Sequence, residues 1–211
     1  MKRECHVRFC ESGGVRFPSA TRLVVGFEHE ADARRFWDAM RARFAKFDLA
    51  LHEEKTRLLE FGRDAAVRRR RRGLGKPETF NFLGFTFYCG RSRRGAFLLQ
   101  RKTRADRMKA KLQEITRELT RCMHATIPDQ GRWLQSVVRG YFGYHAVPTN
   151  YRALAAFRYH VATVWRRVLC RRSQRAPFSW DRMRRIVDAW LPFPRILHPW
   201  PNQRFAVTHP R

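Results

Sequence analysis

Apolar residues in the C-terminal half of the chain recur with a helical period. Such a stripe predicts a helix with one buried face, and four helices follow from the pattern. The first starts near Thr103. The second spans Gln130–His145, and Pro128 suits its first turn. The third begins after Asn150 and the fourth after Ser179. Thr103, Asn150 and Ser179 are suited to cap helix N-termini.

Short apolar runs typical of strands precede this region. They are Leu23–Phe27, Leu58–Phe61 and Phe80–Tyr88, the last apolar on both faces as in a central buried strand. Ala96–Gln100 can pair with Phe80–Tyr88 across the turn CGRSRRG, which predicts a hairpin. Between the first two runs, Glu30–Phe47 has the period of one amphipathic helix.

These patterns predict an α+β protein: a small antiparallel sheet with one helix, followed by an α-helical bundle. Residues 1–18 show no clear period, and we expect the N-terminus up to residue 22 to be poorly ordered. Residues 23–100 form the sheet domain and residues 101–211 the helical domain. The five prolines in Leu191–Arg211 predict an extended tail that packs on the bundle.

The charge of the chain indicates a polyanionic partner. Lys and Arg number 45 against 18 Asp and Glu, a formal net charge of +27. Nucleic acid is the partner that best screens such a charge. Between residues 62 and 111 there are 16 basic and three acidic residues, including five successive arginines at Arg68–Arg72. We expect this run to be a mobile solvated loop before it binds phosphate.

Other classes of function find no support in the sequence. No stretch of about 18 apolar residues could span a membrane, and the start of the chain has no apolar run of a secretion signal. The five cysteines form no disulfide or paired zinc pattern, which favours a reducing, cytoplasmic location. The histidines are scattered without a catalytic motif. We therefore assign no catalytic residue, no metal ligand and no cofactor.

The second predicted helix carries the string GRWLQSVVRGYFGYHAVPTN, with the pattern GRWLxxxVxGYFxYxxVPxN. It resembles the maturase-specific domain of group II intron reverse transcriptases. Four other landmarks in the same order extend the resemblance from Leu23 to Arg211: LVVGF, LHEEKTRLLEFG, GKPETFNFLGFTF and RILHPWPNQRFAVTHPR. The resemblance implies that residues 23–100 are a partial reverse transcriptase palm and that residues 101–211 are thumb and maturase domain.

Polymerase chemistry needs carboxylates that hold two divalent ions. In the family they belong to a YADD sequence before the strand that LVVGF resembles, where this chain has Thr21 and Arg22. We therefore expect no independent polymerase activity, and Mg²⁺ only in a complete polymerase. Lys55 matches a lysine of the family's KT motif near incoming nucleotide. The absence of fingers before residue 23 predicts a truncated or frameshifted reading frame.

The resemblance implies an RNA-binding protein that binds group II intron RNA and assists splicing. An alternative is the C-terminal half of a split RNA-directed DNA polymerase, which would bind RNA/DNA duplex and need an N-terminal reverse transcriptase half as a partner chain. A third possibility is a decayed, non-functional product. Soluble expression and an RNA-binding assay would separate the first possibility from the third.

Two sets of candidate RNA-binding residues follow. Charge predicts phosphate contacts by Arg68, Arg69, Arg70, Arg71, Arg72, Lys76, Arg91, Arg93, Arg94, Arg101, Lys102, Arg104 and Arg107. Discrimination between RNAs is expected where planar and aromatic groups surround the maturase helices. These residues are Arg132, Arg139, Tyr144, Arg152 and Arg158. For Tyr144 a role in the protein core is the competing interpretation.

Overall fold

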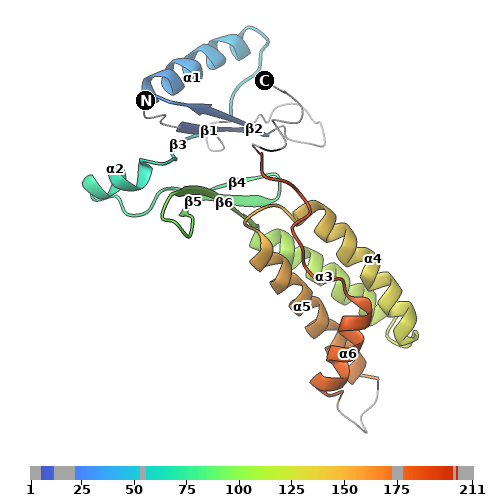
Figure 1. Cartoon of the computed structure of the whole chain (residues 1–211). Helices are drawn as coiled ribbons and strands as arrows, with labels where there is room; N and C mark the ends of the chain where they lie inside the picture. Colours follow the sequence, from blue (N-terminus) through green and yellow to red (C-terminus); the bar gives the residue numbers. More distant parts are fainter. Residues whose placement is uncertain (1–5, 12–21, 53–55, 173–177, 202, 204–211) are drawn as a thin grey trace. The chain divides into compact units, whose positions relative to one another are not determined.

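The structure of the protein is a computed structural model, which describes residues 6–11, 22–52, 56–172, 178–201 and 203 (Figure 1). It has the α+β class that the sequence predicts. The chain forms two compact units. The first comprises Met1–Leu83 with Phe87–Gln100, and the second comprises Gly84–Thr86 with Arg101–Arg211. Thr21 and Lys55, singled out in the sequence, lie outside the described residues.

A three-stranded antiparallel sheet begins the first unit. Strand β1 (His6–Glu11) lies between β2 (Arg22–Phe27) and β3 (Arg57–Glu60), with His6 opposite both Phe27 and Glu60. The expectation of poor order throughout residues 1–22 is therefore wrong for β1. The string HVRFC alternates polar and apolar residues, which is a strand signal. Pairing on both sides then satisfies its backbone groups.

Helix α1 (Glu30–Ala45) follows β2. It confirms the helix predicted over Glu30–Phe47 and ends two residues earlier. Its Ala33 is buried, and the ring of Phe36 lies 5.2 Å from that of Phe27 on β2. The helix therefore attaches to the sheet through its apolar stripe, as an amphipathic helix does.

A second sheet has the order β4-β5-β6, with β4 at Phe80–Phe82, β5 at Phe85–Arg91 and β6 at Phe97–Thr103. The predicted hairpin between β5 and β6 is confirmed, and Ser92 N–H donates to Ala96 O across its turn. The prediction of one strand over Phe80–Tyr88 is wrong. Leu83 and Gly84 have φ of 45° and 77°, so the chain turns between β4 and β5.

The arginine run is helical, which contradicts the predicted loop. Helix α2 covers Ala65–Arg71, with Arg72 as its C-cap. Gly73 follows at φ 70°, and its N–H donates to Arg70 O while Leu74 N–H donates to Arg69 O. These two bonds form a Schellman motif, which ends helices at a left-handed glycine. Arginine is a good helix former, and cations near a helix C-terminus interact favourably with the helix dipole.

The described residues of the second unit form four helices, as predicted: α3 (Ala105–Arg121), α4 (Ile127–His145), α5 (Tyr151–Cys170) and α6 (Trp180–Trp190) (Figure 1). Their inward stripes meet in one core. Its largest fully buried side chains include Trp165, Phe157, Ile115, Leu119, Leu134, Leu154 and Met183. Helix α4 begins three residues before the predicted Gln130, because Thr126 caps it by accepting a bond from Asp129 N–H.

One of the three predicted caps holds as predicted. Ser179 Oγ accepts a bond from Arg182 N–H at 3.3 Å and caps α6. Thr103 does not cap α3, whose N-cap is Arg104. Asn150 occupies the N-cap position of α5 without making the side-chain cap bond. Its amide instead donates to Thr103 Oγ1 and accepts from Thr103 N–H at 2.9 Å, which joins residues 47 positions apart.

The segment after α6 lies against the bundle, as predicted, for as far as the structure describes it. Leu191 is buried. The N–H groups of Leu197 and His198 both donate to Ala146 O, the C-cap residue of α4. The ring of His198 also contacts Gly143 O through Nε2 at 2.7 Å. These bonds satisfy carbonyls that the end of a helix leaves without intrahelical partners.

Candidate nucleic-acid interface

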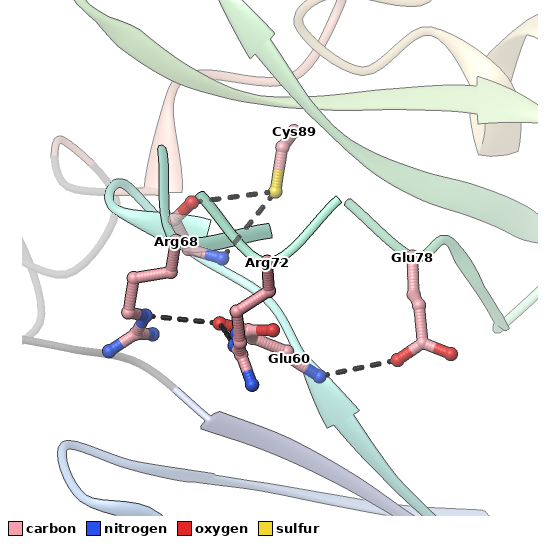
Figure 2. A network of polar contacts seen from close by, with 6 residues as sticks. Glu60, Arg68, Arg72, Glu78 and Cys89 are labelled. Atoms are coloured by element: carbon pink, nitrogen blue, oxygen red, sulfur yellow. Dashed lines mark hydrogen bonds and ion pairs between the residues drawn. The ribbon is translucent and has the colours of Figure 1, made fainter. Parts of the chain in front are cut away.

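The five arginines at residues 68–72 do not share one environment. Figure 2 shows that Glu60, at the end of β3, accepts bonds from two of them. Arg68 Nε lies 3.0 Å and Arg72 Nη2 lies 2.6 Å from Glu60 Oε1, while the Glu60 side chain is only 14% exposed. A buried carboxylate needs such partners. Arg68 and Arg72 therefore hold α2 against β3 before they serve any ligand.

The other members of the run differ in exposure. Arg70 and Arg71 are exposed, whereas Arg69 is half-buried and its Nε has no partner among the described residues. Arg70 and the exposed Lys76 line a shallow cavity of about 400 Å³ beside Gly73 and Gly75. Two cations over glycines leave room for a phosphate group to approach the backbone. Arg70 and Arg71 are therefore the members of the run whose exposed side chains pair with no carboxylate in the described residues.

The β5–β6 hairpin displays three further candidates of the first unit. Arg91 ends β5, while Arg93 and Arg94 occupy the turn, and all three are exposed. Gly95 closes the turn at φ 78°. A short turn with several arginines places their planar guanidinium groups close together. Guanidinium groups match the geometry of phosphate oxygens.

Four phosphate candidates belong to the second unit. Lys102 and Arg107 are exposed. Arg104 is paired with Asp106 at 2.6 Å, and this hydrogen bond holds the pKa of the Asp106 carboxyl below its usual value. Arg101 is half-buried, and burial lowers the pKa of its guanidinium. Arg107 is therefore better placed for a phosphate contact than Arg101 or Arg104, and the set is divided between both units.

The residues predicted to discriminate between RNAs lie on α4 and α5. Arg132 pairs with Asp129, while Arg139 and Arg152 are exposed. Tyr144 is 53% exposed and stacks on Phe85, with 5.8 Å between ring centroids. The interpretation of Tyr144 as a core residue is therefore not supported.

Arg158 has a structural role in addition to any contact with RNA. Its Nη2 lies 2.9 Å from Asp188 and its Nε donates to Leu191 O at the end of α6. Its guanidinium also lies 4.4 Å from the centroid of the Phe193 ring. The side chain is 17% exposed. Arg158 thus joins α5 to the C-terminus of α6, where a cation also complements the helix dipole.

Every carboxylate of the second unit is already engaged by a cation. Residues 101–211 contain 23 Lys and Arg but six Asp and Glu, a formal charge of +17. The six pairs are Arg104–Asp106, Lys111–Glu114, Arg121–Glu118, Arg132–Asp129, Arg184–Asp181 and Arg158–Asp188. The excess positive charge therefore has no side-chain carboxylate inside the unit to balance it.

Sequence reasoning missed a groove between α5 and α6. It has a volume of about 560 Å³, and four aromatic residues line it: Tyr151, Tyr159, Trp180 and Phe193. Tyr151 and Tyr159 are eight positions apart on one helix, so the sequence showed that they share a face. Trp180 and Phe193 come from a later segment, and no sequence period relates them to α5.

A buried aromatic cluster lies where α4 ends. Burial lowers the pKa of His145 to about 4 and raises the pKa of Tyr141 to about 12. The ring of His145 contacts Tyr141 at 4.3 Å and Phe85 at 5.3 Å. Desolvation disfavours the charged form of either group, so His145 is neutral at pH 7. We interpret the cluster as part of the core.

No protein-family model matches this chain, and the search of curated proteins found no match. Within the described residues, no group of three or more His, Cys, Asp or Glu is placed to hold a metal ion. None of the helices in that part of the chain is long and apolar enough to cross a membrane.

Proposed function

We propose that this protein binds group II intron RNA and assists its splicing, without independent polymerase activity. The unbalanced charge of the second unit carries the proposal: each of its carboxylates has a cation, and a formal charge of +17 remains. The sequence resemblance to the maturase-specific domain supplies the identity of the RNA. The chemistry of splicing belongs to the RNA, while the protein offsets repulsion between phosphates as the RNA folds.

Arginine is suited to this task because its planar fork binds phosphate and also stacks on unpaired bases. The first unit offers Arg70 and Arg71 on α2, and the second offers Arg107, Arg139 and Arg152. None of these five is held by a carboxylate among the described residues, unlike Arg68 and Arg72. We expect them to make phosphate contacts.

The test is a filter-binding titration across salt concentrations with intron RNA and an unrelated structured RNA. The variant Arg70→Gln/Arg71→Gln removes two exposed cations and keeps residues with good helix propensity. We expect weaker binding to both RNAs and a log–log salt slope reduced by about 1.4 to 1.8, since each of the two lost contacts contributes about 0.7 to 0.9.

The matched control is Arg34→Gln/Arg35→Gln on α1. It removes the same charge, but these arginines are paired with Glu30 and Asp32. If both variants change affinity and slope equally, the effect is one of net charge and the assignment to α2 is wrong.

Assistance to splicing needs a second measurement. The wild-type protein should accelerate splicing of intron RNA at a Mg²⁺ concentration too low for the RNA alone. Equal binding of both RNAs together with no acceleration would reduce the function to general RNA binding. Primer extension by the purified chain on a primed RNA template would contradict the absence of polymerase activity, which is expected from Thr21 and Arg22 in place of the family's aspartates.

A further inference from the structure

We propose that the groove between α5 and α6 binds unpaired bases of RNA by stacking. This inference rests on the proposed RNA-binding function and names a site that charge alone would not reveal. Buried Ala162 and Val187 belong to the groove lining, and exposed aromatic rings form its rim. Its volume of about 560 Å³ falls within the range of about 300 to 1,000 Å³ typical of ligand sites.

The aromatic residues of the groove are unusually exposed. Tyr151 is 52%, Tyr159 60%, Trp180 36% and Phe193 58% accessible. They make up four of the seven exposed aromatic residues in the described part of the chain. An apolar patch gathered in one groove marks a binding surface, whereas scattered apolar residues on a surface are ordinary.

The rings are arranged to extend a stack. The planes of Tyr159 and Trp180 differ by 7°, with 6.2 Å between their centroids. The guanidinium of Arg166 lies 4.9 Å from the centroid of the Trp180 ring, and that of Arg158 lies over Phe193. Cations against ring faces restrict the rings. Flat and restricted rings with an open face are the platforms on which successive bases stack in proteins that bind single strands.

Charge selects a nucleic acid as the occupant. The two arginines that line the groove are neutralised, Arg158 by Asp188 and Arg184 by Asp181. The same two helices carry further exposed cations that pair with no carboxylate in the described residues: Arg152, Arg167, Arg182 and Arg185. A strand can therefore place its bases in the neutral aromatic groove and its phosphates near the arginines.

The experiment measures binding of the full chain to a fluorescently labelled ten-nucleotide oligouridylate and to a ten-base-pair RNA duplex by anisotropy. Tyr159→Ala should weaken binding to the single strand by about 5- to 150-fold, as loss of one stacking residue does. The salt slope should stay unchanged because no cation is removed. Binding of the duplex, whose bases are already stacked, should be unaffected.

Two variants control the interpretation. Tyr159→Phe keeps the ring and should retain wild-type affinity. Phe47→Ala removes an equally exposed aromatic side chain from the first unit and should change nothing. Because Tyr159 is 60% exposed, its replacement should leave the thermal melting curve intact. Photocrosslinking with 4-thiouridine in the oligonucleotide should label a peptide of α5 or α6.

The outcomes separate this inference from the proposed function. If the wild-type chain binds neither intron RNA nor the oligouridylate, the proposed function fails and the inference fails with it. If it binds RNA but Tyr159→Ala has no effect, or weakens strand and duplex equally, the stacking site alone is overturned. Binding of a proline-rich peptide that depends on Tyr159, with no effect on the oligonucleotide, would also overturn it and identify a peptide groove instead.

Discussion

Two glycines on α4 should respond in opposite directions to the same substitution. A Cβ atom added at Gly131 would lie 2.4 Å from Cδ2 and 2.6 Å from Cγ of Trp190, the last residue of α6. A Cβ added at Gly140, nine residues later on the same helix, meets nothing within 4 Å. Gly131 thus lets α4 and α6 approach closely, while Gly140 contributes no contact that alanine would disturb.

The magnitudes follow from two effects. Alanine is favoured over glycine inside a helix by about 0.8 to 1.0 kcal/mol, and both variants gain this. Overpacking typically costs about 1 to 3 kcal/mol, and it applies to Gly131→Ala alone. The indole of Trp190 cannot yield cheaply, because Cγ and Cδ2 are the atoms of the ring nearest the backbone. The two variants should therefore differ in unfolding free energy by about 1 to 3 kcal/mol, with Gly140→Ala the more stable.

The assay is urea unfolding followed by far-ultraviolet circular dichroism, with the midpoint and m-value compared. A double variant, Gly131→Ala/Trp190→Leu, should recover stability relative to the sum of the single changes, because it removes the conflicting ring. Equal stability of Gly131→Ala and Gly140→Ala would refute the reasoning and show that Trp190 does not pack against this part of α4.

Two further predictions concern buried polar groups. Gln130 accepts a bond from Trp165 Nε1 at 2.8 Å and donates to Cys122 O at 2.7 Å, so Gln130→Leu should destabilise the protein by about 1 to 3 kcal/mol in the same urea assay. The exposed control Gln113→Leu should change stability by less than about 0.5 kcal/mol, and equal effects would contradict a role for this network. The pKa of His145 is about 4 in the folded protein and 6.5 ordinarily, so the unfolded state binds the extra proton and stability should fall by up to about 3 kcal/mol as pH drops from 6.5 to 4. His145→Phe should flatten the pH dependence of the urea midpoint across that window, and an unchanged slope would show that another group is responsible.

Local periodicity was sufficient to predict the helices of the second unit. Stripes such as Met108, Leu112, Ile115 and Leu119 depend on spacing within one helix, and all four side chains contribute to the core. Caps were less predictable. Thr103 has the composition of a cap, but Asn150 engages it from 47 positions away. Rules based on neighbouring residues cannot predict a bond across 47 positions, so this tertiary contact overrode the local preference of Thr103 for capping.

The break between β4 and β5 and the helical arginine run show a second limit of prediction from sequence patterns. Gly84 was visible as a possible break in Phe80–Tyr88, yet the apolar run on both sides favoured continuity. The run of like charges predicted a solvated loop at Arg68–Arg72, but that prediction omitted Glu60, which lies eight residues before Arg68. Glu60 forms ion pairs with both Arg68 and Arg72. The Gly73 that ends α2 was the sequence signal for a helix there.

The two parts of the candidate site, the exposed arginines and the aromatic groove, differed in how far the sequence could predict them. The exposure of Arg70 and Arg71 could be expected from charge alone, because a dense run of cations with few carboxylates nearby stays at the surface in most folds. The aromatic groove could not be located, because its rim joins Tyr159 to Trp180, which are brought together only when α5 and α6 pack. A site formed by one segment can be predicted from sequence, whereas a site formed by two helices can be located only when the packing of those helices is known.

The ion pairs of the second unit use all of its side-chain carboxylates, so its remaining cations have no acidic side chain within the unit to pair with. Five of the six pairs join residues two or three positions apart, and only Arg158–Asp188 joins different helices. Local pairs of this kind stabilise a helix by about 0.2 to 0.5 kcal/mol and do little to hold helices together. The apolar core must therefore offset the repulsion among the remaining cations. A polyanion relieves that repulsion in the folded state, where the cations are held close together, so RNA binding and folding stability should be coupled.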